Sequence, residues 1–156
     1  MFKIESNDIS DLRKALKGLP NKIHDRVLVQ ANRRAAKIVL DQAIQRAPVR
    51  EGQKLKKVST GDTKGSKGYR YPGYLKQNIK IIYVKGLRRA GKILHVLRPV
   101  KHAFYGLFLE EYGSSRQAAR PWLRPAFDAN KMRSFSEYKI HAKRGIDRAW
   151  KRLGKG

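Results

Sequence analysis

Apolar residues recur every three or four positions between Pro20 and Pro48, and this spacing predicts a long helix. Proline suits the first turn of a helix, and the residue before a proline disfavours helical geometry, so we expect the helix to end near Arg46–Ala47. Arginine and lysine occupy the other faces. The apolar positions of this helix are Ile23, Val27, Ala31, Ala35, Ile38 and Val39.

The same spacing predicts a last helix that begins near Pro125 and ends at Gly154. Its apolar positions are Met132, Phe135, Ala142, Ile146, Ala149, Trp150 and Leu153. A short helix is also expected over 7–18, capped by Ser6 or Asn7 and ended by Gly18.

Alternation of side chains predicts two strands in the middle of the chain, over 74–84 and 92–100. Together they form a hairpin, 76–101, that is rich in lysine and arginine and contains no acid. A short helix over 103–112 follows, with Gly113 as its left-handed end. The order of elements predicts an α+β fold over 1–156, a single domain whose long helices pack on a small antiparallel sheet.

Residues 48–73 show no period and are dominated by Gly, Ser, Thr and Lys. We interpret this segment as a long basic loop on the β side of the fold. Loops of this length in a compact domain are usually functional or disordered.

The net charge of the chain is +25, from 37 Lys+Arg against 12 Asp+Glu. A charge of this size indicates a polyanionic partner, and the alternative is a solvated surface with no partner. The chain has no cysteine, which excludes disulfides and thiolate chemistry. No apolar run is long enough for a membrane span, and the N-terminus lacks the apolar stretch of a signal peptide. We therefore expect synthesis and use in a cytoplasm, or release from one by lysis.

Candidate catalytic motifs are weak throughout. In the segment GDTKGSKG, Gly61 and Gly65 are too close for a phosphate loop, and Lys67 is followed by glycine. The four histidines are not spaced as metal ligands, and the serines lack a nucleophile context. We therefore predict no catalytic residue, no cofactor, no metal and no small-molecule substrate.

The stretch 102–128, HAFYGLFLEEYGSSRQAARPWLRPAFD, concentrates aromatic residues, two adjacent acids and a proline-framed tryptophan. Three roles are open for the two acids, Glu110 and Glu111. They form a solvated end of the helix, they pair with nearby arginines of the same chain, or they dock on arginines of a neighbouring copy. Trp122 is equally an interface anchor or a core residue, and Phe127 is expected in the core. As a hypothesis, the intersubunit interface comprises Glu110, Glu111, Tyr112, Arg120, Trp122 and Arg124.

The hairpin and the 48–73 loop carry basic residues among tyrosines, a composition that favours nucleic acid without sequence reading. No nucleic-acid-reading motif accompanies them. The candidate contacts to DNA, or to an adjoining partner, are Lys54, Lys56, Lys57, Lys64, Lys67, Arg70, Lys85, Arg88, Arg89 and Lys92.

The order of several motifs resembles that of the tail-component, or neck, proteins that join head to tail in long-tailed bacteriophages. The motifs are LPNKI at 19–23, RAPV at 46–49, GYLKQNI at 73–79, HAFYGLFLEEYG at 102–113 and RPWLRPAFD at 120–128. The last motif is the most specific, with Trp122 where the family commonly has phenylalanine. The insertion between Pro48 and Gly73 is not covered by the resemblance.

The resemblance implies a structural virion protein without catalysis. It implies a homo-oligomeric ring, six-membered or alternatively twelve-membered, at the head–tail junction of the virion, assembled in the cytoplasm of the bacterial host. The implied partners are head-closure or connector proteins, tail-terminator or tail-tube proteins, and packaged double-stranded DNA held by non-specific contacts. A sequence-independent nucleic-acid-binding protein, associated with ribosomes or the nucleoid, is the competing interpretation, and a small basic nuclease is a third.

Overall fold

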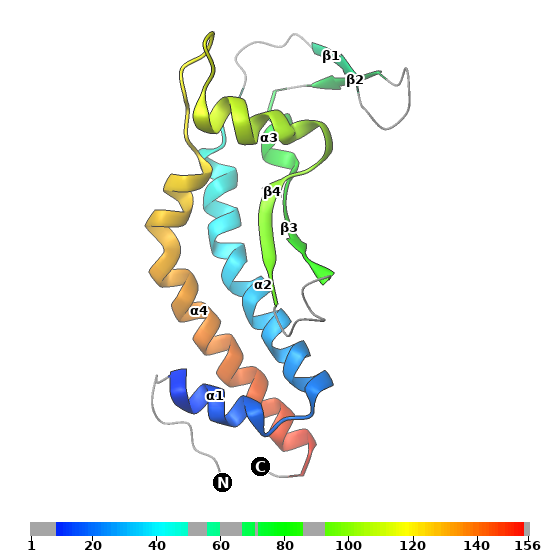
Figure 1. Cartoon of the computed structure of the whole chain (residues 1–156), viewed down its shortest axis with the longest axis vertical. Coiled ribbons are helices and arrows are strands. Elements are labelled where there is room, and N and C mark those ends of the chain that lie inside the picture. Colours follow the sequence, from blue (N-terminus) through cyan, green and yellow to red (C-terminus); the bar gives the residue numbers. More distant parts are fainter. Residues whose placement is uncertain (1–8, 50–55, 60–66, 71, 86–92, 155–156) are drawn as a thin grey trace. The chain divides into compact units, whose positions relative to one another are not determined.

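The computed structural model describes residues 9–49, 56–59, 67–70, 72–85 and 93–154 (Figure 1). The predicted caps Ser6 and Asn7 lie outside these residues. The α-helices are α1 (Ile9–Lys17), α2 (Asn21–Arg46), α3 (Tyr74–Gln77) and α4 (Leu123–Arg152), and the strands are β1 (Lys56–Ser59), β2 (Lys67–Arg70), β3 (Ile79–Tyr83) and β4 (His95–Pro99). Where a short helix was expected over 103–112, a 3-10 helix spans Lys101–Phe104 and a π-helical segment spans Gly106–Glu110. The predicted α+β class is confirmed.

Two predictions of local structure are wrong. Residues 74–77, expected to begin a strand, form α3, in which Gln77 N–H donates to the Gly73 carbonyl and Leu75 is buried. Gly73 has a φ of 81°, a left-handed conformation that turns the chain into this helix.

The segment 48–73, expected to be a loop, contains the antiparallel pair β1–β2, in which Lys56 faces Arg70 and Ser59 faces Lys67. Strands of four residues are too short to show alternation.

Strands β3 and β4 form the second two-stranded sheet. Val84 N–H donates to the Leu94 carbonyl at one end, and Val100 N–H donates to the Asn78 carbonyl at the other. The numbers rise on one strand as they fall on the other, so the pair is an antiparallel hairpin, as predicted.

The described chain divides into two compact units. Unit 1 takes its residues from 1–38, 83–96 and 131–156, and unit 2 takes its residues from 39–82 and 97–130. Helices α2 and α4 each contribute residues to both units.

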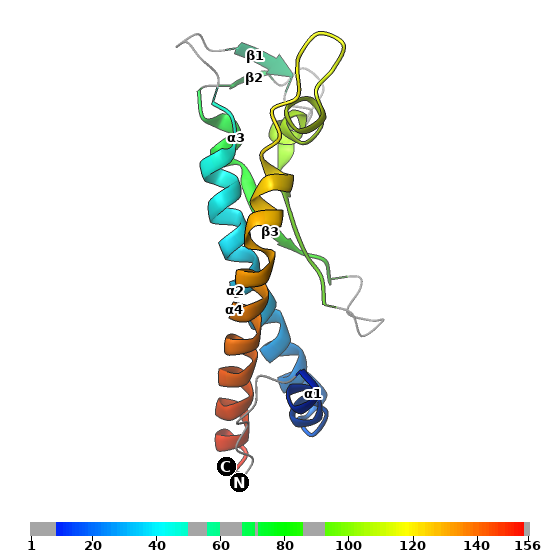
Figure 2. The same ribbon diagram turned by 90° about the vertical axis from the view of Figure 1, so that its left-hand side faces the viewer.

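In unit 1, α4 lies along α2 (Figure 1 and Figure 2). Ser134 Oγ donates a hydrogen bond of 2.9 Å to the Ala35 carbonyl, so the two backbones approach closely. A Cβ atom built on Gly145 would lie 2.7 Å from Val27 Cγ1, so glycine is required by the same close packing. The core of this unit consists of Leu12, Ala15, Leu19, Val27, Ile146 and Ala149.

The buried row of α2 advances by four residues at each step. It comprises Val27, Ala31, Ala35, Val39 and Ala43, and Ala47 continues it just after the helix ends. The predicted face is therefore confirmed for its middle positions, while Ile38 lies beside the row and is half-buried. Residues four apart form a ridge on a helix surface, and alanines in the ridge let another helix approach closely.

The predicted apolar face of α4 is confirmed only between Ala142 and Trp150, because Leu153 at its end is 38% exposed. Ala142, Ile146 and Ala149 are buried, whereas Phe127 is 55% exposed and Met132 is 72% exposed. Phe135 is also exposed. Phe127 and Met132 follow the buried residues Ala126 and Asn130 by one and two positions, which turns their side chains away from the core. The expectation that Phe127 completes the core is therefore wrong.

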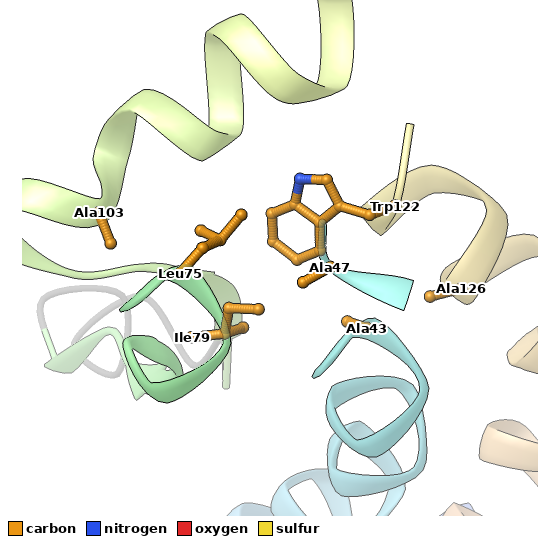
Figure 3. Close-up of a cluster of buried hydrophobic side chains, with 7 residues drawn as sticks. All are labelled: Ala43, Ala47, Leu75, Ile79, Ala103, Trp122 and Ala126. Atoms are coloured by element: carbon orange, nitrogen blue, oxygen red, sulfur yellow. The ribbon is translucent and has the colours of Figure 1, made fainter. Parts of the chain in front are cut away.

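The core of unit 2 surrounds Trp122 (Figure 3). Trp122 is 0% exposed, and its indole N–H donates to the Gly106 carbonyl at 2.9 Å. The other buried members are Ala43, Ala47, Leu75, Ile79, Ala103 and Ala126.

Candidate functional site

Glu111 connects the segment before Gly113 to the first turn of α4. Its Oε2 accepts hydrogen bonds of 2.8 Å from the backbone N–H groups of Trp122 and Leu123, and its Oε1 accepts one of 2.9 Å from that of Arg124. The first N–H groups of a helix have no partner within it, so a carboxylate in this place acts as a cap. Glu111 thus links two segments of unit 2 through hydrogen bonds.

The pKa of Glu111 reflects two opposed influences. Burial alone raises the pKa of the carboxyl, but the three backbone N–H donors and the Arg124 guanidinium outweigh it and lower the pKa below its ordinary value. The side chain is therefore charged at neutral pH.

These contacts change the predicted intersubunit interface. Glu111 and Trp122 both have their partners within unit 2 and are buried there, so neither is available to a neighbouring copy. Their assignment to the interface is corrected to a structural role. The physical reason is that the turn at Gly113, where φ is 77°, brings the carboxylate to the start of α4.

The remaining predicted interface residues stay accessible. Tyr112, Arg120 and Arg124 are exposed, and Glu110 is half-buried. Glu110 Oε2 accepts a hydrogen bond of 3.1 Å from Gln117, and the Glu110 carbonyl accepts one of 2.7 Å from Arg120 N–H. The loop 113–120 is thereby tied to the helical segment before it.

An exposed aromatic surface extends from Tyr112 along the preceding helical turns. Phe108 is 59% exposed and Tyr112 is 65% exposed, and Leu109 between them is exposed as well. The ring centroids of Phe104 and Phe108 lie 6.1 Å apart. We call Phe104, Phe108, Leu109 and Tyr112 the aromatic surface.

Two arginines flank the aromatic surface. The Arg124 guanidinium carbon lies 5.3 Å from the centre of the Tyr112 ring, and that of Arg98 lies 5.2 Å from the centre of the Phe104 ring. These are cation–π distances.

Sequence reasoning missed Phe108 and Leu109 as candidate contact residues. The available signal was the run Leu107-Phe108-Leu109, because three consecutive side chains on a helix point about 100° apart and cannot all face one core.

The predicted DNA-contact residues are only partly described. Lys54, Lys64, Arg88, Arg89 and Lys92 lie outside the described residues. Lys56, Lys57, Lys67 and Arg70 belong to the pair β1–β2, and Lys85 is exposed just after β3. The role of these residues remains a prediction.

His95 lies against Tyr83, with ring centroids 5.2 Å apart. Within the described part of the chain, neither His95 Nδ1 nor Tyr83 Oη has a hydrogen-bond partner, although both atoms are buried. Burial and the nearby Arg33 charge lower the pKa of His95, so the imidazole is neutral at pH 7.

Among the described residues, no three acids or histidines come together as a metal site would require. No helix of this part of the chain combines the length and the apolar character needed to cross a bilayer.

Comparisons with protein-family models, with curated proteins and with solved structures found no match to this chain. The resemblance to phage neck proteins therefore rests on the motifs in the sequence.

Proposed function

We propose that the protein is a non-enzymatic structural component of a phage neck, forming an oligomeric ring that helps to join head to tail around the DNA channel. The observation that carries the proposal is the exposed aromatic surface of unit 2. It lies within the motif on which the family resemblance rests, HAFYGLFLEEYG.

The composition of this surface supports a protein partner. Aromatic side chains and arginine are enriched in protein interfaces, whereas lysine and glutamate are depleted from their centres. Phe108 and Tyr112 are typical anchors, since each removes a large apolar area from water when it enters a pocket. Glu110 and Arg120 are placed to form charged contacts at the rim.

The charge around the surface favours a ring over a twofold dimer. In a twofold dimer the same patch meets itself, so Arg98 and Arg124 of one copy would face those of the other. A ring joins two different patches, and the aromatic surface then meets another face of the next copy. We propose six subunits, with twelve as the alternative.

The proposed setting is the head–tail junction of the virion, after assembly in the host cytoplasm. The adjoining partners are head-closure or connector proteins and tail-terminator or tail-tube proteins. Packaged double-stranded DNA is contacted through basic side chains without sequence reading, a mode of binding for which a net charge of +25 is suited.

The proposal is tested by removing the anchors. The double variant Phe108→Ser/Tyr112→Ser is expected to lower the oligomeric mass measured by sedimentation, with an unchanged circular dichroism spectrum because both side chains are exposed. Met132→Ser is the matched control, since Met132 is 72% exposed and apolar but lies on α4 in unit 1. An unchanged mass of the double variant contradicts the proposal.

One observation favours a second function. The basic charge is explained equally by a sequence-independent nucleic-acid-binding protein of the ribosome or nucleoid. That function predicts a monomer that retains RNA or DNA, and it gives no reason for the aromatic surface.

A further inference from the structure

We infer that the outer face of α2 in unit 1 is a binding surface for the backbone of double-stranded DNA. Lys22, Arg26, Arg33 and Lys37 form this basic face of α2. The inference deepens the proposed function and rests on it for the identity of the polyanion. Sequence reasoning placed the DNA contacts elsewhere, on the 48–73 loop and the 76–101 hairpin.

The four side chains form one narrow stripe. They follow one another by four, seven and four positions, so at 3.6 residues per turn they fall within about 60° around the helix axis and extend for roughly 22 Å along it. The buried row Val27, Ala31 and Ala35 lies on the opposite side of the helix. The stripe therefore points away from the core of unit 1.

The exposed residues of this part of α2 share one chemistry. They are Asn21, Lys22, Arg26, Gln30, Arg33, Arg34 and Lys37. All are cations or amides, and the first exposed acid of α2 is Asp41, four positions beyond Lys37. Cationic and amide side chains are those that contact DNA phosphates.

This arrangement opposes the stability of the isolated helix. Lys22 and Arg26, like Arg33 and Lys37, are pairs of like charges four positions apart, which destabilise a helix. The first turn of α2 contains no acid, although the helix dipole favours one there. A solvated helix face commonly alternates positive and negative charges. On the basic face of α2 the charges are alike, and a bound polyanion would offset their repulsion.

The same residues distinguish duplex DNA from other polyanions. Binding of single strands uses exposed aromatic rings for base stacking, and binding to an acidic membrane uses apolar side chains that enter the bilayer. The exposed part of α2 between 21 and 37 offers neither. A rigid row of cations and amides fits the regular backbone of a duplex and reads no sequence.

The experiment measures binding of the full-length protein to a short random-sequence DNA duplex as a function of salt. The test variant is Lys22→Gln/Arg26→Gln/Arg33→Gln/Lys37→Gln. The control is Arg133→Gln/Arg144→Gln/Arg148→Gln/Lys151→Gln on α4, whose exposed positions also include Asp147. Each variant removes four positive charges, so both lower the net charge equally.

The slope of log affinity against log salt becomes shallower by about 0.9 for every phosphate that the protein no longer neutralises. We expect the α2 variant to reduce the slope by about 3.6, the value for four phosphates, and the α4 control by less than about 1. Equal reductions in the two variants would overturn the inference, as would tighter binding of the wild-type protein to single strands or to acidic vesicles. If the quadruple α2 variant fails to fold, Lys22→Gln/Arg26→Gln is expected to reduce the slope by about 2.

The outcome separates this inference from the proposed ring. The mass of every variant is measured alongside its DNA affinity, and the α2 variant is expected to assemble as the wild type does. A monomer that binds duplex DNA through α2 refutes the ring and leaves the inference standing. A ring whose DNA affinity does not depend on α2 refutes the inference and leaves the ring standing.

Discussion

Glu111 accepts hydrogen bonds from three consecutive backbone N–H groups at the start of α4. Its neighbour Glu110 is half-buried and bonds to Gln117 in the following loop. The two adjacent acids therefore have different roles, one as a helix cap and one at the surface.

Replacing Glu111 by glutamine is expected to lower the free energy of unfolding by about 1–2 kcal/mol at pH 7, because the helix start loses a charged cap. The folded pKa of Glu111 is lowered, so its contribution is fully present above the ordinary pKa and disappears as pH falls through the folded pKa. Urea denaturation at pH 7 and at pH 3 measures how the free energy of unfolding changes with pH.

The difference between wild type and Glu111→Gln is thus expected to shrink at acid pH. Glu110→Gln is the matched control and is expected to change the unfolding free energy by less than about 0.5 kcal/mol. Equal effects of the two substitutions would contradict the capping role.

The sequence predicted which stretch matters but not which residue does what. The motif 102–128 was expected to combine acids, aromatics and a helix start, and all of these lie in unit 2. Burial of Glu111 and Trp122 depends on the turn at Gly113, which brings together residues eleven positions apart. Nothing in the local pattern distinguishes Glu111 from Glu110.

In unit 1 the buried residues of α2 are spaced by four, and those of α4, which are Ala142, Ile146 and Ala149, are spaced by four and three. Small residues at the contact let Ser134 reach the Ala35 carbonyl and leave no space for a side chain at Gly145. The packing of these helices therefore depends on the absence of a side chain at Gly145 as much as on the apolar side chains at the contact.

Gly145→Ala tests this packing. Alanine favours a helix by about 1 kcal/mol, but a new Cβ 2.7 Å from Val27 Cγ1 costs more, so we expect a net loss of about 1–2 kcal/mol of stability. In a Val27→Ala background the clash is absent, and the same substitution is expected to be neutral or stabilising. Chemical denaturation of the four proteins of this cycle measures the coupling, and an equal effect of Gly145→Ala in both backgrounds would disprove it.

The helices were predictable because their period extends over many residues, and the short elements were not. Tyr74–Gln77 was expected to extend a strand, and a helix of four residues with one buried side chain, Leu75, has no period that could indicate α3. Met132 was assigned to the core because its spacing fits a helical period, and Phe127 was expected to complete the core beside Trp122. Which face of α4 is covered depends on tertiary contacts that a single-helix pattern does not contain.

The charge of +25 acts on the whole molecule. Like charges repel across the folded surface, and the repulsion decreases as salt shortens the screening length from about 10 Å at 0.1 M to about 3 Å at 1 M. The folded state is therefore expected to be least stable at low salt.

Raising sodium chloride from about 0.02 to 0.5 M is expected to increase Tm by at least 2–4 °C, which corresponds to about 1 kcal/mol for a chain of this size. Thermal denaturation followed by circular dichroism measures the shift. The variant that neutralises the basic face of α2 is expected to show a smaller increase. A Tm that is constant or falls with salt would show that the basic residues are already compensated within the fold.

The central claim is that the protein forms a ring, and native mass spectrometry of the nuclease-treated, salt-washed protein tests it most directly. We expect a closed oligomer of six subunits, or of twelve, with a ring visible by negative-stain electron microscopy. A monomer that retains RNA or DNA would contradict the ring and favour the nucleic-acid-binding alternative.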